Sequence, residues 1–258
     1  RFLARNPSQP SALAFRAFAL RDLGRVADAR ELADPERFIY RQALTAPDGF
    51  ESIQAFNTAL GAHVLSHPTL TPAPKAHATR KGRHSGELLS PPLGPMAQFR
   101  REIENAFRTY KRCFIGEPSH PFLDACPDDV TVSVWGVVME QDGHQVAHIH
   151  PAAWLSGVYY VEVPVSIQAD DPDHAGWIEF GRPPADIHAH HDPEVTLFQP
   201  EPGLMILFPS HFYHRTVPLA EDFSIDVDDY ETANGGIVIA NPNAPTGMAV
   251  PRQTIDRR

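Results

Sequence analysis

A series of short strand-like segments dominates the second half of the chain. Between residues 130 and 208, runs rich in β-branched and aromatic residues alternate with Pro, Gly and Asp, which end strands and form turns. Many short strands with regular turn signals favour a β-barrel or a β-sandwich, and such barrels bind ligands at their mouths. The expected strands are 130–139, 156–163, 176–180, 194–198 and 203–208, with a turn at 141–143.

The first half of the chain has a helical period instead. Apolar residues recur at helical spacing over 11–32, 49–66 and 93–113, and the third of these helices is the clearest. The segment 11–32 resembles the end of a tetratricopeptide repeat. One such helix pair cannot bury its own apolar face. The segment is therefore either a truncated repeat or an ordinary helical hairpin packed on the main domain.

Three histidines form the candidate metal site of the sequence. His148 and His150 flank one residue, and in an extended segment their side chains point to the same face. A third imidazole, His214, follows the apolar run 203–208 after enough residues for several strands to return to the same place. A pair of histidines is weak evidence in a chain that has 14 of them, but the strands on either side favour a site. Imidazole suits Fe, Zn, Cu and Ni.

Composition restricts the class of partner. The formal net charge of −10 argues against nucleic acid and anionic membranes as partners, because both attract clustered Lys and Arg. A small-molecule or peptide substrate fits better. No apolar run reaches the roughly 18 residues of a membrane span and no signal peptide is recognisable, so we expect a cytoplasmic protein. Cys113 and Cys126 form no close-spaced motif.

Two other groups of polar residues are weaker candidates. The segment 68–95 is expected to be a loop, and its cationic residues either hold an anionic substrate at the rim of the site or are simply solvated. Four further histidines are expected to be solvated loop residues that do not bind metal. The cationic group is Lys75, Arg80, Lys81, Arg83 and His84, and the four histidines are His188, His190, His191 and His211.

A set of motifs occurring in order over residues 34–218 resembles a family of bacterial 2-oxoglutarate/Fe(II) oxygenases associated with tetratricopeptide repeats. The motifs are Gly49–Asn57, Trp135, Gly143, His148–Pro151, Trp154–Val161, Ile178–Pro183, Pro202–Ser210 and Tyr213–Pro218. The resemblance implies a mainly β domain with α-helices, a double-stranded β-helix of the jelly-roll or cupin-like kind with a helical N-terminal region. It also implies Fe(II) near the open end of the barrel, and 2-oxoglutarate and O2 consumed as a substrate C–H bond is hydroxylated. Repeats preceding the chain would then offer a surface for a protein partner.

The resemblance also implies roles for single residues. His148 and His214 would be metal ligands, and His150 stands where many members of the family have an Asp. A site of three neutral imidazoles should hold a dianionic co-substrate more strongly but select Fe(II) over Zn(II) less well. In the alternative, His150 turns aside and water takes the third position. Ser156 and Tyr160 share one side of their strand and are the expected co-substrate contacts, although Tyr160 is equally well explained as a core aromatic.

The C-terminal segment departs from this pattern. In similar oxygenases an Arg or Lys shortly after the second metal-ligating histidine pairs with the far carboxylate of 2-oxoglutarate, but no cation occurs between Thr216 and Pro251. Residues 215–250 instead resemble an internal fragment of histidinol-phosphate aminotransferases. We therefore expect a helical region at 1–40, an oxygenase-like domain at 41–218 and an atypical tail at 219–258. The leading hypothesis is an oxygenase impaired by this tail. The alternatives are a catalytically silent metal-binding or protein-interaction module, and a small-molecule-binding barrel with Zn or Ni.

Overall fold

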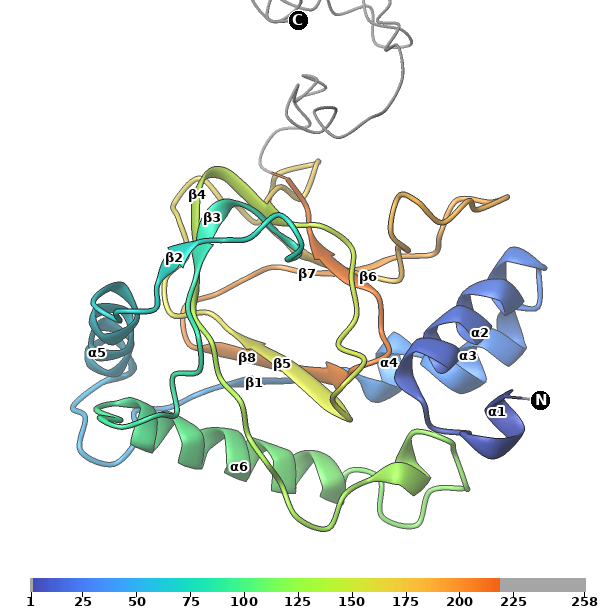
Figure 1. The fold of residues 1–258 in the computed structure, drawn as a ribbon, viewed down its shortest axis with the longest axis horizontal. Helices are drawn as coiled ribbons and strands as arrows, with labels where there is room; N and C mark the ends of the chain where they lie inside the picture. Colours follow the sequence, from blue (N-terminus) through green and yellow to red (C-terminus); the bar gives the residue numbers. More distant parts are fainter. Residues whose placement is uncertain (1, 219–258) are drawn as a thin grey trace, which may run out of the picture. The chain divides into compact units, whose positions relative to one another are not determined.

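The computed structural model describes residues 2–218 as a mixture of helices and antiparallel sheets rather than as a mainly β domain (Figure 1). The sequence also predicts strand character at Gly236–Asn241 and no guanidinium from the C-terminal tail beside the site. Both predictions concern the tail at 219–258, which lies outside these residues. The α-helices are α1 (Phe2–Arg5), α2 (Pro10–Asp22), α3 (Val26–Ala33), α4 (Pro35–Phe38), α5 (Ile53–Leu65) and α6 (Met96–Arg112), and a 3-10 turn, η1, spans Leu123–Ala125. The strands are β1 (Tyr40–Ala43), β2 (Thr71–Pro72), β3 (Thr79–His84), β4 (Val137–Gln145), β5 (Leu155–Tyr159), β6 (Ile178–Phe180), β7 (Thr196–Phe198), β8 (Leu204–Pro209) and β9 (His214–Thr216).

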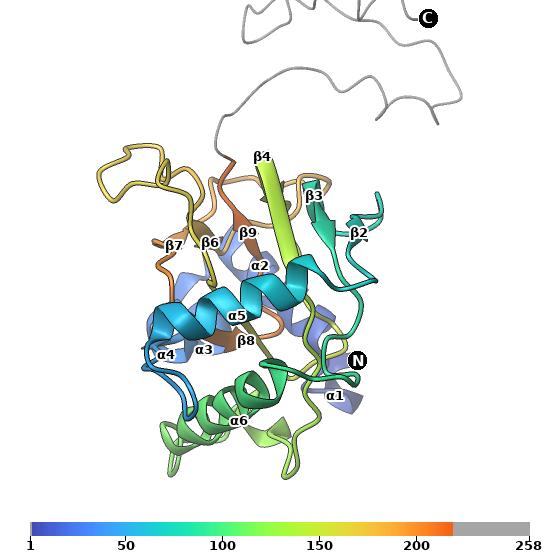
Figure 2. The same ribbon diagram turned by 90° about the vertical axis from the view of Figure 1, so that its left-hand side faces the viewer.

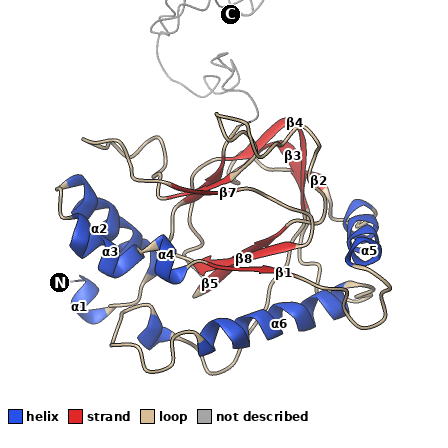
Figure 3. Cartoon of the chain, turned by 180° about the vertical axis from the view of Figure 1, so that it is seen from behind, coloured by secondary structure: helices blue, strands red, loops and turns tan. Residues whose placement is uncertain are grey.

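Nine strands form three antiparallel sheets in the described part of the chain. Their orders are β1-β8-β5, β2-β3-β4 and β7-β6-β9. Figure 1 shows the sheets arranged around a common interior, with α6 along the outside of β1-β8-β5, and the view from behind in Figure 3 agrees. In Figure 2, α5 runs across the front of the strands, on their outer side. Helices α5 and α6 therefore lie outside the strands, and the common interior is left for the site.

Helices α5 and α6 begin and end close to the predicted boundaries because their local signals are strong. The Ser52 hydroxyl accepts a hydrogen bond from the backbone N–H of Ala55 and so caps the first turn of α5. On α6, Phe99 and Tyr110 belong to the buried apolar stripe that packs beneath the sheet. The Tyr110 hydroxyl also donates to the carbonyl of Phe38, at 2.9 Å, which connects α6 to the end of α4.

Several predicted boundaries in the β region were wrong. Residues 130–136 lie outside β4, and the turn expected at 141–143 lies inside it. There the register between β3 and β4 shifts. Between the pairs Arg80–His144 and Gly82–Met139, β3 has one residue and β4 has four. The loop expected at 68–95 contains β2 and β3. Strand β2 has only two residues and β3 is rich in cationic residues, so neither has the apolar alternation that identifies a strand.

The N-terminal helices have a small core of their own. Leu13, Leu20 and Leu32 are among the residues that α2 and α3 bury against each other, and Gly24 makes the turn between the helices with a positive φ of 74°. Two histidine side chains from the main domain reach the end of α3. His120 Nε2 lies 2.8 Å from the carbonyl oxygen of Glu31, and His211 Nε2 lies 3.1 Å from that of Leu32. These contacts fix the hairpin to the strands.

Among the described residues, no helix is long and apolar enough to cross a membrane.

Candidate metal centre

His148 and His214 lie side by side because their backbones pair. The N–H of His148 donates to the carbonyl of His214 at 3.0 Å, and the N–H of His214 donates back at 3.1 Å. His150 is placed by a further backbone bond, from its N–H to the carbonyl of Ser210 at 3.0 Å. The extended segment 148–150 therefore lies along the loop that connects β8 to β9, and each of these residues is positioned by backbone geometry.

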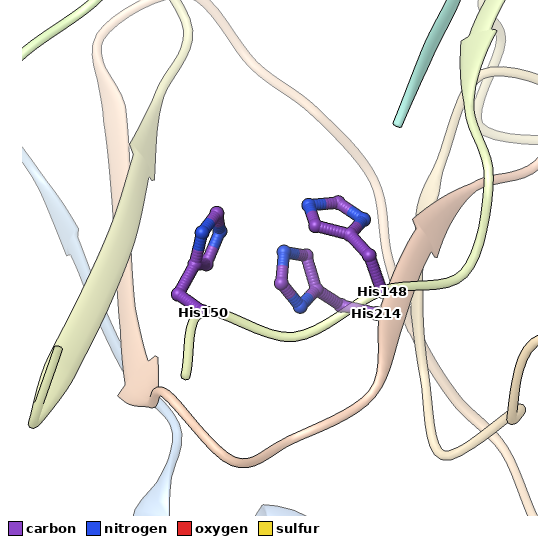
Figure 4. A group of neighbouring side chains, drawn as sticks. All are labelled: His148, His150 and His214. Carbon is purple, nitrogen blue, oxygen red and sulfur yellow. The ribbon is translucent and has the colours of Figure 1, made fainter. Parts of the chain in front are cut away.

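The three imidazoles gather in one space (Figure 4). The ring centroids of His148 and His214 are 4.2 Å apart, those of His148 and His150 are 5.0 Å apart, and those of His150 and His214 are 5.1 Å apart. One nitrogen from each ring lies within 4.8 Å of the other two, so the group could hold a metal ion. Nitrogens that each lie about 2.1 Å from one ion are about 3 Å apart. The 4.8 Å limit includes this spacing, so the three rings are close enough to share one ion.

Hydrogen bonds determine which ring nitrogen is free in His148 and in His214. Nδ1 of His148 lies 2.8 Å from the carbonyl oxygen of Val146, and Nδ1 of His214 lies 3.0 Å from that of Phe212. A carbonyl oxygen can only accept, so we assign the ring proton to Nδ1 in both residues. Nε2 then has a free lone pair in each case. Such contacts from the second ring nitrogen are the usual way in which metal-ligating histidines are oriented.

All three imidazoles are held in the neutral form that metal binding requires. Burial lowers the pKa of His148, and burial together with the neighbouring His148 lowers the pKa of His150 to about 4. The pKa of His214 lies well below its ordinary value, first because the ring is buried and then because His148 and His150 are close. No carboxylate belongs to this group of three. The donor set is therefore uncharged.

Aromatic side chains form the walls around the imidazoles. The ring of Phe208 on β8 lies 4.6 Å from that of His214, and the ring of Phe180 on β6 lies 6.0 Å from it. On the other side, the indole of Trp135 lies 5.7 Å from the ring of His150. Trp135 was part of the motif pattern in the sequence, but its place beside His150 depends on a tertiary contact that no sequence spacing predicts.

Ser156 and Tyr160 lie on the same inner face but near opposite ends of β8. Ser156 is opposite Phe208, and its hydroxyl lies 2.6 Å from that of Ser210, next to the backbone bond that places His150. The N–H of Tyr160 donates to the carbonyl of Leu204 at 3.1 Å, near the far end of β8. Burial raises the pKa of the Tyr160 hydroxyl. No hydrogen bond or ring contact between Tyr160 and the three histidines is found among the described residues.

The four histidines expected to be solvated divide into two kinds. His188, His190 and His191 are exposed as predicted, and His190 bonds through Nδ1 to the carboxylate of Asp22. His211 was predicted wrongly, because it is only 3% exposed. Its burial follows from the contact with the end of α3, which places an imidazole N–H against a helix carbonyl. None of the four belongs to the three-histidine group.

Two guanidinium groups near the site have other partners. Arg215 follows His214 but points to the opposite face of β9, where it pairs with the buried carboxylate of Glu179 at 2.7 Å. Arg41 on β1 lies opposite Ile206 and so shares the inner face, with its guanidinium 4.7 Å from the ring centre of Phe198. In the part of the chain that the structure describes, neither cation contacts the histidine group.

Comparison with known proteins connects this geometry to a family. Residues 133–225 match the family described as "Putative 2OG-Fe(II) oxygenase". The match is to an oxygenase family. All three histidines fall inside the matched oxygenase segment, which covers a part of the chain only. A solved structure, a prolyl-4-hydroxylase from Pseudomonas putida, is similar with a TM-score of 0.45 and 14% identity, covering 76% of this chain and 91% of that one.

A second, shorter similarity concerns a different family. A stretch of 46 residues is 59% identical to a histidinol-phosphate aminotransferase of Lactococcus lactis subsp. cremoris, covering 18% of this chain and 13% of that protein. A stretch of 44 residues is 52% identical to histidinol-phosphate aminotransferase 1 of Hydrogenovibrio crunogenus, covering 17% and 12%. The chain thus spans about an eighth of the length of these relatives. Both resemblances expected from the sequence, to oxygenases and to aminotransferases, are confirmed.

Proposed function

We propose that the chain is a non-haem oxygenase that depends on Fe(II) and 2-oxoglutarate and hydroxylates a C–H bond of a small molecule or peptide. The observation that carries this proposal is the gathering of His148, His150 and His214 inside the segment that matches the oxygenase family. We propose further that the sheets form a double-stranded β-helix. Facing antiparallel sheets with the site between them support this.

The proposed roles follow from the contacts of each side chain. His148 and His214 would offer Nε2 to Fe(II), since Nδ1 is engaged in each, and His150 would complete one face of the metal. Three ligands on one face leave positions for a chelating keto acid and for O2. When bound, the iron supplies the redox chemistry of the reaction. The apolar walls formed by Phe180 and Phe208 would keep water away from it.

Ser156 and Tyr160 are the proposed co-substrate contacts. The hydroxyl pair Ser156–Ser210 lies next to the loop that carries His150, within the inner face of β5 and β8. Tyr160 keeps its proton because burial raises its pKa, so it can donate a hydrogen bond to a carboxylate. A dianionic keto acid would also experience no repulsion from the metal ligands, because the three imidazoles carry no negative charge.

Succinate formation tests this function. Protein loaded with Fe(II) and supplied with 2-oxoglutarate, O2 and ascorbate should release succinate above the level of a His148→Ala control. Metal content of both proteins, measured in parallel, shows whether loss of activity follows loss of metal. His190→Ala is the matched control, since His190 is exposed and bonds to Asp22. Metal bound at one ion per chain with no succinate above the control contradicts the oxygenase proposal.

The second candidate is a metal-binding or protein-interaction module without turnover. It is favoured by the donor set, because three neutral imidazoles with an open position are also a set that Zn(II) accepts. It is favoured as well by the partners of Arg41 and Arg215, which are a phenyl ring and a glutamate rather than the inner space beside the histidines. Stoichiometric Zn(II) binding without succinate formation would be its signature.

A further inference from the structure

Three aromatic side chains lead from His150 towards the surface, and we name them the ring ladder: Trp135, His84 and His77. The indole of Trp135 lies 5.7 Å from the ring of His150. The ring of His84 on β3 also stacks against the indole, with centroids 5.9 Å apart and planes 20° apart. His77 meets His84 edge to face at 4.8 Å. The site is therefore continuous with a line of aromatic rings.

The backbone that carries Trp135 is firmly held, although it lies outside any strand. The carboxylate of Glu87 accepts hydrogen bonds from the Ser133 hydroxyl and from the N–H of Val134. On the other side, the N–H of Gly136 donates to the Ser85 hydroxyl at 2.8 Å, and the N–H of Ser85 donates to the carbonyl of Gly136 at 2.9 Å. A backbone segment held in this way loses little conformational freedom when a ligand binds beside it.

A close approach by α5 fixes the direction of the Trp135 side chain. Gly136 lies against Val64, and a Cβ at this position would be only 2.5 Å from a methyl group of that valine. The side of the segment that faces α5 is therefore filled. Because neighbouring side chains in an extended segment point to opposite faces, the indole of Trp135 is directed to the face that carries His84 and His150.

Trp135 also differs from the other two tryptophans in what its indole binds. The N–H of Trp154 donates to the carbonyl of Phe122 at 2.7 Å, and that of Trp177 donates to the carbonyl of Gln168 at 3.3 Å. Trp135 is 42% exposed, and its indole N–H has no acceptor among the described residues. A rigid, partly exposed tryptophan with a free donor is typical of a surface that binds a ligand.

We propose that Trp135 and His84 form a substrate-binding subsite that stacks an aromatic ring bearing a polar group, beside the metal ligand His150. This inference rests on the proposed function for its identification of the ligand as substrate, but the stacking itself requires no metal. The indole N–H would donate to the polar group, and the ring would lie against the indole. An aromatic pair contributes about 0.5–1.5 kcal/mol beyond its buried area. That range corresponds to about a 2- to 13-fold change in dissociation constant.

The test measures binding of N-acetyltyrosinamide to the full chain by calorimetry and by saturation-transfer NMR. N-acetylcyclohexylalaninamide, which has a similar size but no aromatic ring, is the matched ligand. The variants are Trp135→Ala, Trp135→Phe and, as a matched control, Trp177→Phe. Each measurement is repeated with His148→Ala, which disturbs the proposed metal site and leaves the contact between Trp135 and His150 in place.

Binding of the tyrosine probe should weaken about 2- to 13-fold in Trp135→Ala, recover largely in Trp135→Phe and stay unchanged in Trp177→Phe. The saturated ligand should bind more weakly than the tyrosine probe. Equal binding by wild type and Trp135→Ala, equal binding of the two ligands, or no binding to wild type up to the solubility limit would each overturn the proposal. Binding that depends on Trp135 and persists in His148→Ala supports the subsite even if no succinate is formed, so the two proposals fail separately.

Discussion

At the scale of single residues, the main feature of the candidate site is that its three imidazoles carry no charge. His148, His150 and His214 are neutral, and no carboxylate belongs to their group. In oxygenases with two histidines and one carboxylate, the charged ligand favours Fe(II) and offsets part of the metal charge. An uncharged set leaves that choice to geometry and to metal availability. Under the proposed function, residue 150 is therefore the position at which a carboxylate would change the metal preference of the site.

We expect His150→Asp to raise the preference of the site for Fe(II) over Zn(II) and to raise succinate formation, because the substitution recreates a set of two imidazoles and one carboxylate. Competition between the two metals under anaerobic conditions, followed by metal analysis, measures the preference. His190→Asp adds the same charge on an exposed loop and should leave the preference unchanged. A His150→Asp protein with the same metal ratio as wild type would show that residue 150 does not contact the ion.

At the scale of secondary-structure elements, docking of α3 depends on two imidazoles. His120 and His211 point their Nε2 atoms at the carbonyl oxygens of Glu31 and Leu32, at the C-terminal end of the helix. Burial lowers the pKa of both rings, and that of His211 falls to about 4. Both are therefore neutral at neutral pH and act as N–H donors. The helical hairpin is held by hydrogen bonds rather than by ion pairs at this contact.

We expect the free energy of unfolding to fall with acidification because of His211. The imidazole titrates near pH 6.5 in an unfolded chain and at about 4 in the fold, so between these values the unfolded chain binds a proton that the folded chain does not. Stability is full above about pH 6.5 and is lost as the pH drops, by about 2 kcal/mol between pH 7 and pH 5. Urea unfolding at both pH values measures this difference.

His211→Gln should show a smaller loss of stability on acidification than wild type, because it removes the titrating ring and keeps an N–H donor. His191→Gln, which alters an exposed loop histidine, should behave like wild type. If His211→Gln loses as much stability as wild type between the two pH values, the acid sensitivity arises elsewhere, for example at the three histidines of the candidate site.

The elements also show where sequence reasoning succeeds. Helix α6 could be predicted closely because its apolar residues recur over several turns. Strands β1, β2 and β3 were missed, since each is short and β3 carries mostly cationic residues on a partly exposed surface. The bulge in β4 looked like a turn because both use the same residue types, here Gln-Asp-Gly. Local pattern therefore identified long elements and not short ones.

At the scale of the whole domain, the site depends on pairing between distant segments. The spacing of His148 and His150 predicted a shared face, but the approach of His214 could only be anticipated from the return of several strands. The backbone bonds between His148 and His214 and between His150 and Ser210 bring these segments together. Burial of His211 could not be foreseen either, because it requires the position of α3. The sequence pattern does not predict such contacts between separate elements.

Metal binding should therefore stabilise the whole domain, because one ion would connect the segment after β4 to β9. A metal that binds the folded chain alone adds about 2.7 kcal/mol at a concentration one hundred times its dissociation constant. In a domain of this size that raises Tm by about 5–10 °C. Thermal unfolding with Zn(II), which avoids oxidation, measures the shift. His148→Ala should abolish it and His190→Ala should keep it. A wild-type Tm that does not respond to Zn(II) would mean that the three imidazoles do not act as one site, because ligands from separate segments that share an ion cannot bind it without opposing unfolding.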